Sequence, residues 1–332
     1  MKQSDYIKEI ARMALSNDNN RLIEVLYDFI SYSQKNNRLK LALQLQEIIK
    51  DTGRTEELGK LREINHRSDI DNGCEDIILQ KVASSYSLKD LICTDTVKSD
   101  LRYFIREREA SDSFASIGIL SSNKLILHGP SGCGKTLAAY VLAGELHQPL
   151  FIINLGAIVS SKLGETSRNL TRIFKMASYE KAIIFLDEFD SIGKIRDYDQ
   201  DHGEMKRVVN TILQLFDFLN KESVVIAATN QIKMIDDALL RRFDLSVKLD
   251  YPKTEQVERL LSSTMRGRFE FDDISVKNEV VSLCHNVSYY SIKRTLMTAI
   301  KRTILDQGAN SKTINTTLWK SLIIAETNRN DL

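Results

Sequence analysis

The chain has 332 residues, and its 46 lysines and arginines nearly balance its 45 aspartates and glutamates, for a formal net charge of +1. This balance gives no support for general binding to nucleic acid or membrane surfaces, and four scattered cysteines without a CxxC pair indicate neither a zinc site nor a disulfide framework. No apolar run is long enough to span a membrane, so we expect a cytoplasmic protein with a sizeable core.

The first part of the chain is predicted to be helical. Apolar residues recur at helical spacing through residues 1–51, interrupted by short runs of aspartate and asparagine that would cap helices. We expect a small all-α module here, and the sequence leaves open whether it binds a substrate or a partner. Residues 52–87 are mixed and polar with several glycines, which indicates a connector.

An α/β domain is predicted over residues 88–250. Its first helix carries an apolar face made of Val97, Leu101, Phe104 and Ile105. The charged run Arg106–Glu109 ends this helix, and we expect it to be a solvated helix face without a function.

A glycine-rich loop follows the short apolar run Leu125–Leu127 and precedes an apolar helix. The loop and the helix start comprise Gly129, Pro130, Ser131, Gly132, Cys133, Gly134, Lys135, Thr136 and Leu137. This order is typical of a phosphate-binding loop, in which backbone N–H groups and a helix N-terminus hold phosphate. Lys135 would reach the β- and γ-phosphates of a nucleotide, and Thr136 would bind Mg²⁺. The alternative is an ordinary glycine turn, and Cys133 is expected to be a tolerated small residue.

Further apolar runs predict buried strands that alternate with helices, at Leu150–Leu155, Ala182–Asp190 and Ser223–Asn230. This alternation favours a parallel sheet with helices on both faces. The second run ends in acidic residues, as a strand does at an active site. Asp187 would hold Mg²⁺ through water and Glu188 would polarise an attacking water; a plain acidic turn is the alternative.

Together these stretches resemble the AAA+ ATPases, and within them the AAA subfamily, over about two-thirds of the chain. GPSGCGKT resembles the Walker A motif and IIFLDEFD the Walker B motif. The resemblance implies a P-loop NTPase domain, ATP and Mg²⁺ as cofactors, and a C-terminal helical lid over residues 251–332. It also implies that Asn230 is the sensor-1 residue that holds the attacking water.

The run Ile235–Asp244 resembles the family's second region of homology and places Arg241 and Arg242 at the arginine-finger positions. In the family these residues reach the γ-phosphate of a neighbouring subunit, so the resemblance implies a homo-oligomeric ring, usually a hexamer. Arginine suits this role because it stabilises the negative charge of a transferred phosphoryl group. The alternative for one of the two arginines is a structural salt bridge, and we favour Arg241 as the finger.

Two features differ from the family pattern. The pore loop is expected at Lys162, Leu163 and Gly164, so a lysine stands where family unfoldases carry an aromatic residue. Vigorous threading of a substrate is therefore in doubt, although Leu163 could still grip a chain by apolar contact. In addition, the lid offers no firmly placed sensor-2 arginine; Lys293 and Arg294 lie near the expected region.

The resemblance implies an ATPase that hydrolyses Mg-ATP and remodels or unfolds a protein substrate as an oligomeric ring. The alternative is an ATP-switched regulatory ring that holds, activates or inhibits a partner enzyme. A subtilisin-like protease is the expected partner, because the layout looks like small bacterial or phage ATPases, some of which are encoded beside such proteases. The neutral charge argues against a third reading, a DNA-handling protein such as a loader.

Overall fold

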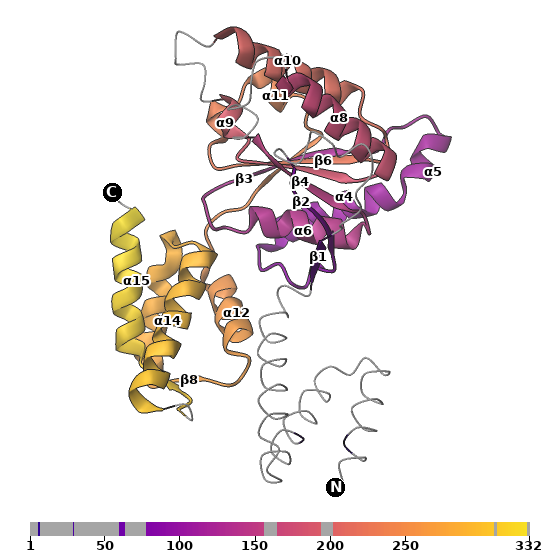
Figure 1. Ribbon diagram of the computed structural model, residues 1–332. Helices are drawn as coiled ribbons and strands as arrows, with labels where there is room; N and C mark the ends of the chain where they lie inside the picture. The colour runs from indigo at the N-terminus through magenta and orange to yellow at the C-terminus, as the bar shows by residue number, and fades with distance from the viewer. Residues whose placement is uncertain are drawn as a thin grey trace. The chain divides into compact units, whose positions relative to one another are not determined.

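The computed structural model describes residues 6, 29, 60–63, 78–155, 165–193, 202–308 and 311–330 (Figure 1). The chain divides into two units, Met1–Arg62 and Glu63–Leu332. In the first unit, Tyr6 and Phe29 are helical and their ring centroids lie 5.4 Å apart. The rest of the predicted all-α module of residues 1–51 lies outside the described residues.

A seven-stranded sheet runs through the described α/β part in the order β1-β2-β4-β5-β6-β3-β7. The strands are β1 (Leu61–Glu63), β2 (Ile78–Ser84), β3 (Lys124–His128), β4 (Leu150–Asn154), β5 (Ile183–Asp187), β6 (Val224–Thr229) and β7 (Leu245–Lys248). β4, β5, β6, β3 and β7 pair in parallel, which confirms the predicted mostly parallel sheet. β2 pairs with β4 in the antiparallel direction. It lies in the segment 52–87 that the sequence suggested was a connector, so the sheet begins before residue 88.

Helices cover both faces of the sheet, as the alternating pattern predicted (Figure 1). One face carries α8 (Glu165–Glu180) and α10 (His202–Asp217), and the other carries α4 (Asp95–Glu109) and α6 (Lys135–Glu145). Strands covered on both faces have no solvated side, which is why β5 and β6 are almost continuously apolar and buried. Three short helices complete this part: α5 (Ser111–Ser116), α9 (Asp190–Gly193) and α11 (Asp237–Leu240).

The first helix of this domain, α4, departs from the sequence prediction at its charged end. Its buried face contains Val97, Leu101, Phe104 and Ile105, as expected. Arg108, however, is only 8% exposed, and its guanidinium donates to carbonyl oxygens of residues 221 and 222, at 2.7 and 3.2 Å. The run Arg106–Glu109 is therefore not simply a solvated face.

The chain after β7 is helical, with α12 (Thr254–Met265), α13 (Ile274–Leu283), α14 (Tyr289–Gln307) and α15 (Thr316–Asn330). Two short parallel strands, β8 (Glu270–Phe271) and β9 (Thr313–Ile314), pair beside them. The core of this lid centres on Trp319, which is 0% exposed and stacks on Phe271 with ring centroids 5.2 Å apart. Its indole N–H donates to the hydroxyl of Thr295 at 3.3 Å. Among the described helices, none has the length and apolarity needed to cross a membrane.

Candidate active site

The glycine loop between β3 and α6 contains three positions whose backbone conformation only glycine adopts without strain. Gly129, Gly132 and Gly134 have φ values of +138°, +73° and +91°. A Cβ atom at Gly129 would lie 1.9 Å from the carbonyl oxygen of Leu249, just after β7. The loop therefore packs backbone against backbone, and it leads directly into the N-terminus of α6 at Lys135.

Four of the predicted site residues meet where β3, β5 and β6 end. The ammonium of Lys135 donates to the carbonyl oxygens of Gly129 and Pro130, both at 2.8 Å, and to Oδ1 of Asn230 at 2.7 Å. The hydroxyl of Thr136 donates to a carboxylate oxygen of Asp187 at 3.5 Å. The cause is topological, because β5, β6 and β3 are parallel neighbours whose carboxyl ends lie on one edge of the sheet.

Burial sets the protonation of two groups in this loop. It lowers the pKa of the Lys135 ammonium, while Cys133, Asp187 and Asp190 act in the opposite direction. Burial raises the pKa of the Cys133 thiol to about 11, and this side chain is only 2% exposed. Cys133 is therefore a protonated, packed side chain at neutral pH, which agrees with its expected role as a small residue in the loop.

Glu188 occupies a strained position directly after β5. Its φ is +51°, in the left-handed region that costs non-glycine residues about 1–3 kcal/mol. The turn is held by its own N–H, which donates to Asp187 at 2.9 Å, and by the N–H of Phe189, which donates to the carbonyl of Ala228 at 2.8 Å. The Glu188 residue is exposed beside Asp187, so a water molecule can reach its carboxylate.

A buried pair that the sequence analysis missed supports the end of β6. The hydroxyl of Thr229 donates to a carboxylate oxygen of Asp190 at 3.0 Å and accepts the N–H of Gln231 at 2.9 Å. Asp190 and Thr229 are both buried, and Asn230 lies in the chain between Thr229 and Gln231, which the second of these hydrogen bonds joins. The sequence signal for this pair is the second aspartate of DEFD, and nothing in the sequence distinguishes it from the rest of an acidic strand end.

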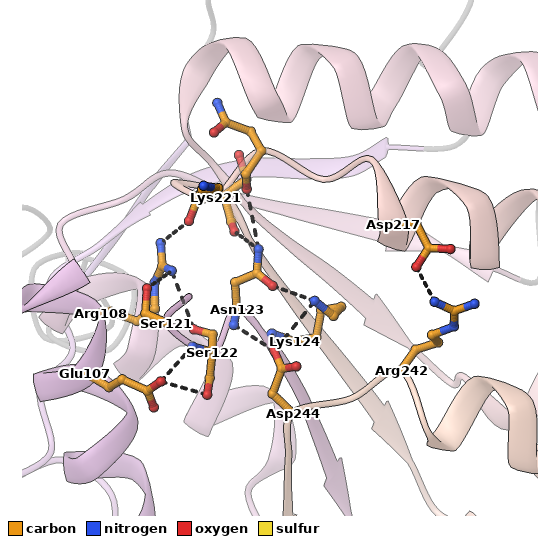
Figure 2. A network of polar contacts seen from close by, with 12 residues as sticks. Glu107, Arg108, Ser121, Ser122, Asn123, Lys124, Asp217, Lys221, Arg242 and Asp244 are labelled. Carbon is orange, nitrogen blue, oxygen red and sulfur yellow. Dashed lines mark hydrogen bonds and ion pairs between the residues drawn. The ribbon is translucent and has the colours of Figure 1, made fainter. Parts of the chain in front are cut away.

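The two arginines differ in their surroundings. Arg242 forms an ion pair with Asp217 at the end of α10 (Figure 2). Arg241, at the end of α11, is exposed and forms no ion pair with any residue in the described part of the chain. The hydrogen bonds of Lys135 go to Gly129, Pro130 and Asn230, so neither arginine is bonded to it.

Two further predictions concern the pore loop and the sensor-2 position of the lid. The pore-loop residues Lys162, Leu163 and Gly164 lie outside the described residues. In the lid, Arg294 forms an ion pair with Glu326 of α15, and its guanidinium carbon lies 5.7 Å from the ring centroid of Tyr290. It is therefore engaged within the lid.

The lid contacts the phosphate loop through residues that the sequence analysis did not single out. The N–H of Tyr290, at the start of α14, donates to the carbonyl of Gly132 at 3.2 Å. A Cβ atom on Gly132 would lie 2.7 Å from the hydroxyl of Ser288. Lid and loop are thus in direct backbone contact, and no sequence motif marked that contact.

Comparisons with known proteins agree with this geometry. Residues 125–251 match the family described as "ATPase family associated with various cellular activities (AAA)". An uncharacterized AAA family ATPase from Sinorhizobium fredii is 30% identical over 232 residues, covering 69% of this chain and 68% of that protein. A putative 26S proteasome regulatory subunit homolog from Methanothermobacter marburgensis is 29% identical over 232 residues, covering 69% and 61%.

The chain is also similar to a zinc metalloprotease and to a solved AAA domain. The ATP-dependent zinc metalloprotease FtsH 2 from Petrotoga mobilis is 33% identical over 199 residues, which cover 58% of this chain but only 32% of that protein. The crystal structure of the FIGL-1 AAA domain has the same fold, with a TM-score of 0.64 and 19% identity over 79% of this chain and 90% of that one. The matched family region runs from β3 to just past β7 and contains every residue assembled above except those of the lid. The chain therefore belongs to the AAA family of ATPases.

Proposed function

We propose that this ATPase hydrolyses Mg-ATP in an oligomeric ring, with sites shared between subunits, and remodels or unfolds a protein substrate. One observation carries the proposal. Lys135, Thr136, Asp187 and Asn230 converge at one edge of the sheet, while Arg241 stands exposed and outside any ion pair with a described residue. Beside the P-loop lysine, an arginine finger stabilises the charge on the transferred phosphoryl group, and in the described part of the chain no arginine joins these four residues in their own subunit.

Each residue has a role that follows from its chemistry. The Thr136 hydroxyl and the Asp187 carboxylate are hard oxygen donors 3.5 Å apart, so they fit a divalent cation such as Mg²⁺. When bound, Mg²⁺ would neutralise charge on the phosphate oxygens. Lys135 would exchange its carbonyl partners for the β- and γ-phosphates. Glu188 would orient the attacking water and accept its proton, and Asn230 would hold that water in line.

The difference between the arginines supports Arg241 as the residue supplied to a neighbour. Arg242 already has a carboxylate partner in its own chain, and breaking that pair would offset part of what it gains elsewhere. Arg241 has no such partner among the described residues, so its guanidinium can meet the phosphoryl oxygens of an adjacent subunit. Charge on those oxygens grows in the transition state, where an arginine stabilises it most.

The test compares two adjacent substitutions. Arg241→Ala should lower kcat by roughly 10³-fold or more without weakening ATP binding, because an arginine supplied in trans acts on the transition state. Arg242→Ala removes an exposed ion pair worth about 0–1 kcal/mol, so its kcat should fall by less than about tenfold. The wild-type specific activity should also rise with protein concentration through the range of assembly. Full activity of Arg241→Ala, or a flat specific activity, would overturn the shared site.

The substrate class rests on the relatives named above, among them a proteasome regulatory subunit homolog and a zinc metalloprotease. The competing proposal is a regulatory ring that controls a partner enzyme such as a subtilisin-like protease, and Lys162 in the expected pore loop favours it. Pull-downs in Mg-ATP separate the two. Glu188→Gln should hold ATP without turnover, and Lys135→Ala should bind ATP poorly. One partner enriched only with Glu188→Gln supports the regulatory ring; many unrelated unfolded chains support the unfoldase.

A further inference from the structure

We propose that Asp244 is a positioning residue for the arginine that each subunit supplies to its neighbour. It would act by fastening the segment 241–244 to the first residues of β3, the strand that leads into the subunit's own phosphate loop. The inference rests on the proposed function, because a positioned arginine matters only where sites are shared between subunits.

The contacts of Asp244 are made with both its backbone and its side chain (Figure 2). One carboxylate oxygen accepts the backbone N–H of Asn123 at 2.8 Å and that of Lys124 at 2.9 Å. The ammonium of Lys124 lies 3.6 Å from the same oxygen. In return, the N–H of Asp244 donates to the carbonyl of Lys124 at 2.9 Å. Hydrogen bonds to an ionised acceptor are about twice as strong as neutral ones, so this is a firm attachment.

The residues that receive Asp244 are themselves held in place. The side-chain amide of Asn123 donates to the carbonyl of Ser223 at 3.3 Å, and the ammonium of Lys124 donates to the amide oxygen of Asn123 at 2.7 Å. Asn123 is buried. Hydrogen bonds therefore hold the amino end of β3, to which Asp244 is attached.

A second layer of contacts fixes the chain just before β3. The buried guanidinium of Arg108 donates to the carbonyls of Lys221 and Glu222 at 2.7 and 3.2 Å. The neighbouring Glu107 accepts the N–H and the hydroxyl of Ser122 at 2.7 and 2.9 Å. Hydrogen bonds thus join the carboxyl end of α4 to the residues that precede β3 and β6 (Figure 2). This is the network at the charged run whose function the sequence did not reveal.

The distance along the chain from this anchor to the arginine is short. Arg241 precedes Asp244 by three residues, and the intervening Phe243 packs edge-on against Phe189 and Phe216, with ring centroids 5.7 and 5.4 Å away. Phe189 directly follows Glu188, the proposed catalytic carboxylate. The segment is therefore attached through Asp244 to the amino end of β3 and packs through Phe243 on the turn after β5. Two such anchors leave Arg241 little freedom to change its backbone position.

The first test is a substitution series at Asp244. Asp244→Ala leaves two backbone N–H groups without their acceptor, so the arginine segment should loosen while the phosphate loop stays formed. Because a misplacement of about 1 Å can cost on the order of 10²-fold in rate, kcat should fall about 10- to 100-fold, with the Kd for ATP changed less than about threefold. Asp244→Asn keeps an acceptor oxygen but loses the charge, so its kcat should lie between those of wild type and Asp244→Ala.

The decisive test mixes subunits, because a purely structural role would respond differently. Asp244→Ala is mixed with Glu188→Gln, which cannot hydrolyse ATP but carries an intact arginine segment. In mixed rings, active sites of Asp244→Ala subunits receive that intact segment, so activity should exceed the sum of the separate proteins. The matched control, Arg241→Ala with Glu188→Gln, should recover in the same way. Asp244→Ala mixed with Arg241→Ala should not recover, because neither supplies a well-placed arginine.

The outcomes distinguish this inference from the function on which it rests. Recovery in both Glu188→Gln mixtures, without recovery in the third, supports the role of Asp244. If Glu188→Gln restores activity to Arg241→Ala but not to Asp244→Ala, the shared site stands and the inference is overturned, because Asp244 then acts on the site of its own subunit. Recovery in neither mixture overturns the shared site itself. If Asp244→Ala fails to fold, the same mixtures are run with Asp244→Asn, and wild-type activity of that variant would also overturn the inference.

Discussion

The close backbone contact at Gly129 makes a quantitative prediction about the phosphate loop. A Cβ atom there would lie 1.9 Å from the carbonyl oxygen of Leu249, whereas an ordinary contact needs at least 3.4 Å. Gly129→Ala must therefore push the two backbones apart by about 1.5 Å. That displacement works against the hydrogen bond from the N–H of Leu249 to the carbonyl of His128, 2.8 Å long, which continues the pairing of β3 and β7.

Two other glycines separate the contributions to this cost. Gly267 has a φ of +68° with nothing within 4 Å of its Cβ position, so Gly267→Ala should cost only the backbone penalty of about 1–2 kcal/mol. Gly144 has an ordinary φ, but its Cβ would lie 2.0 Å from the carbonyl of Tyr86. Overpacking at Gly144 should cost about 1–3 kcal/mol, reduced by about 1 kcal/mol because alanine favours helix. Gly129→Ala combines both penalties, and we expect a loss of about 2–5 kcal/mol.

Thermal melting followed by circular dichroism measures these differences. One kcal/mol shifts Tm by roughly 2–4 °C in domains of 150–250 residues, so Gly129→Ala should melt about 4–20 °C below wild type. It should also lose ATP binding, which Gly267→Ala should retain. If Gly129→Ala melts together with Gly267→Ala and still binds ATP, the backbone contact with Leu249 does not constrain the loop and the reasoning fails.

Two further predictions concern buried groups at the site. Thr229→Val removes the hydroxyl shared by Asp190 and Gln231, so the free energy of unfolding should fall by about 1–3 kcal/mol in a urea titration and kcat should fall with it, whereas Thr229→Ser should restore both; equal losses for the two variants would contradict this. Cys133 should resist alkylation at pH 8 in the folded protein, as read by mass spectrometry, because its pKa is raised to about 11. The same shift predicts that the free energy of unfolding falls from pH 9 to pH 11, because the unfolded thiol ionises at its ordinary pKa of 9.0 while the folded thiol keeps its proton. Fast labelling of folded Cys133 at pH 8 would contradict the raised pKa on which both predictions depend.

The buried strands could be predicted from the sequence, and the edge of the sheet could not. β5 and β6 are continuous apolar runs because helices cover both of their faces, and such runs are visible in a sequence. β2 lies beyond β4, away from the strands that carry the site, and its described residues mix exposed Gln80 with buried Val82. Its antiparallel pairing depends on β4, roughly 70 residues further on, which no local pattern of the kind used here encodes.

The site divides in the same way. Lys135 and Asn230 are 95 positions apart yet bonded, and they were predicted because each falls within a motif of its own. Asp244 ends the run that resembles the second region of homology, but that resemblance implies no role for it, and Arg108 lies in no motif. The carboxylate of Asp244 accepts the backbone N–H of Asn123, and the guanidinium of Arg108 donates to the carbonyl of Lys221, and each of these partners is more than 100 positions away in sequence. Charge in a sequence indicates exposure by default. Only the fold shows that the charged groups of Asp244 and Arg108 form hydrogen bonds with backbone N–H and carbonyl groups just before β3 and β6.

The placement of Trp319 gives the protein a built-in optical probe. It is the chain's one tryptophan, fully buried in the lid, where it stacks on Phe271 and donates to Thr295. Fluorescence excited at the red edge of the tyrosine band therefore reports the lid alone, whereas far-ultraviolet circular dichroism reports every helix and strand. Recording both signals during one melt would resolve whether lid and sheet unfold together, and an emission shift on adding nucleotide would follow the lid without any attached label.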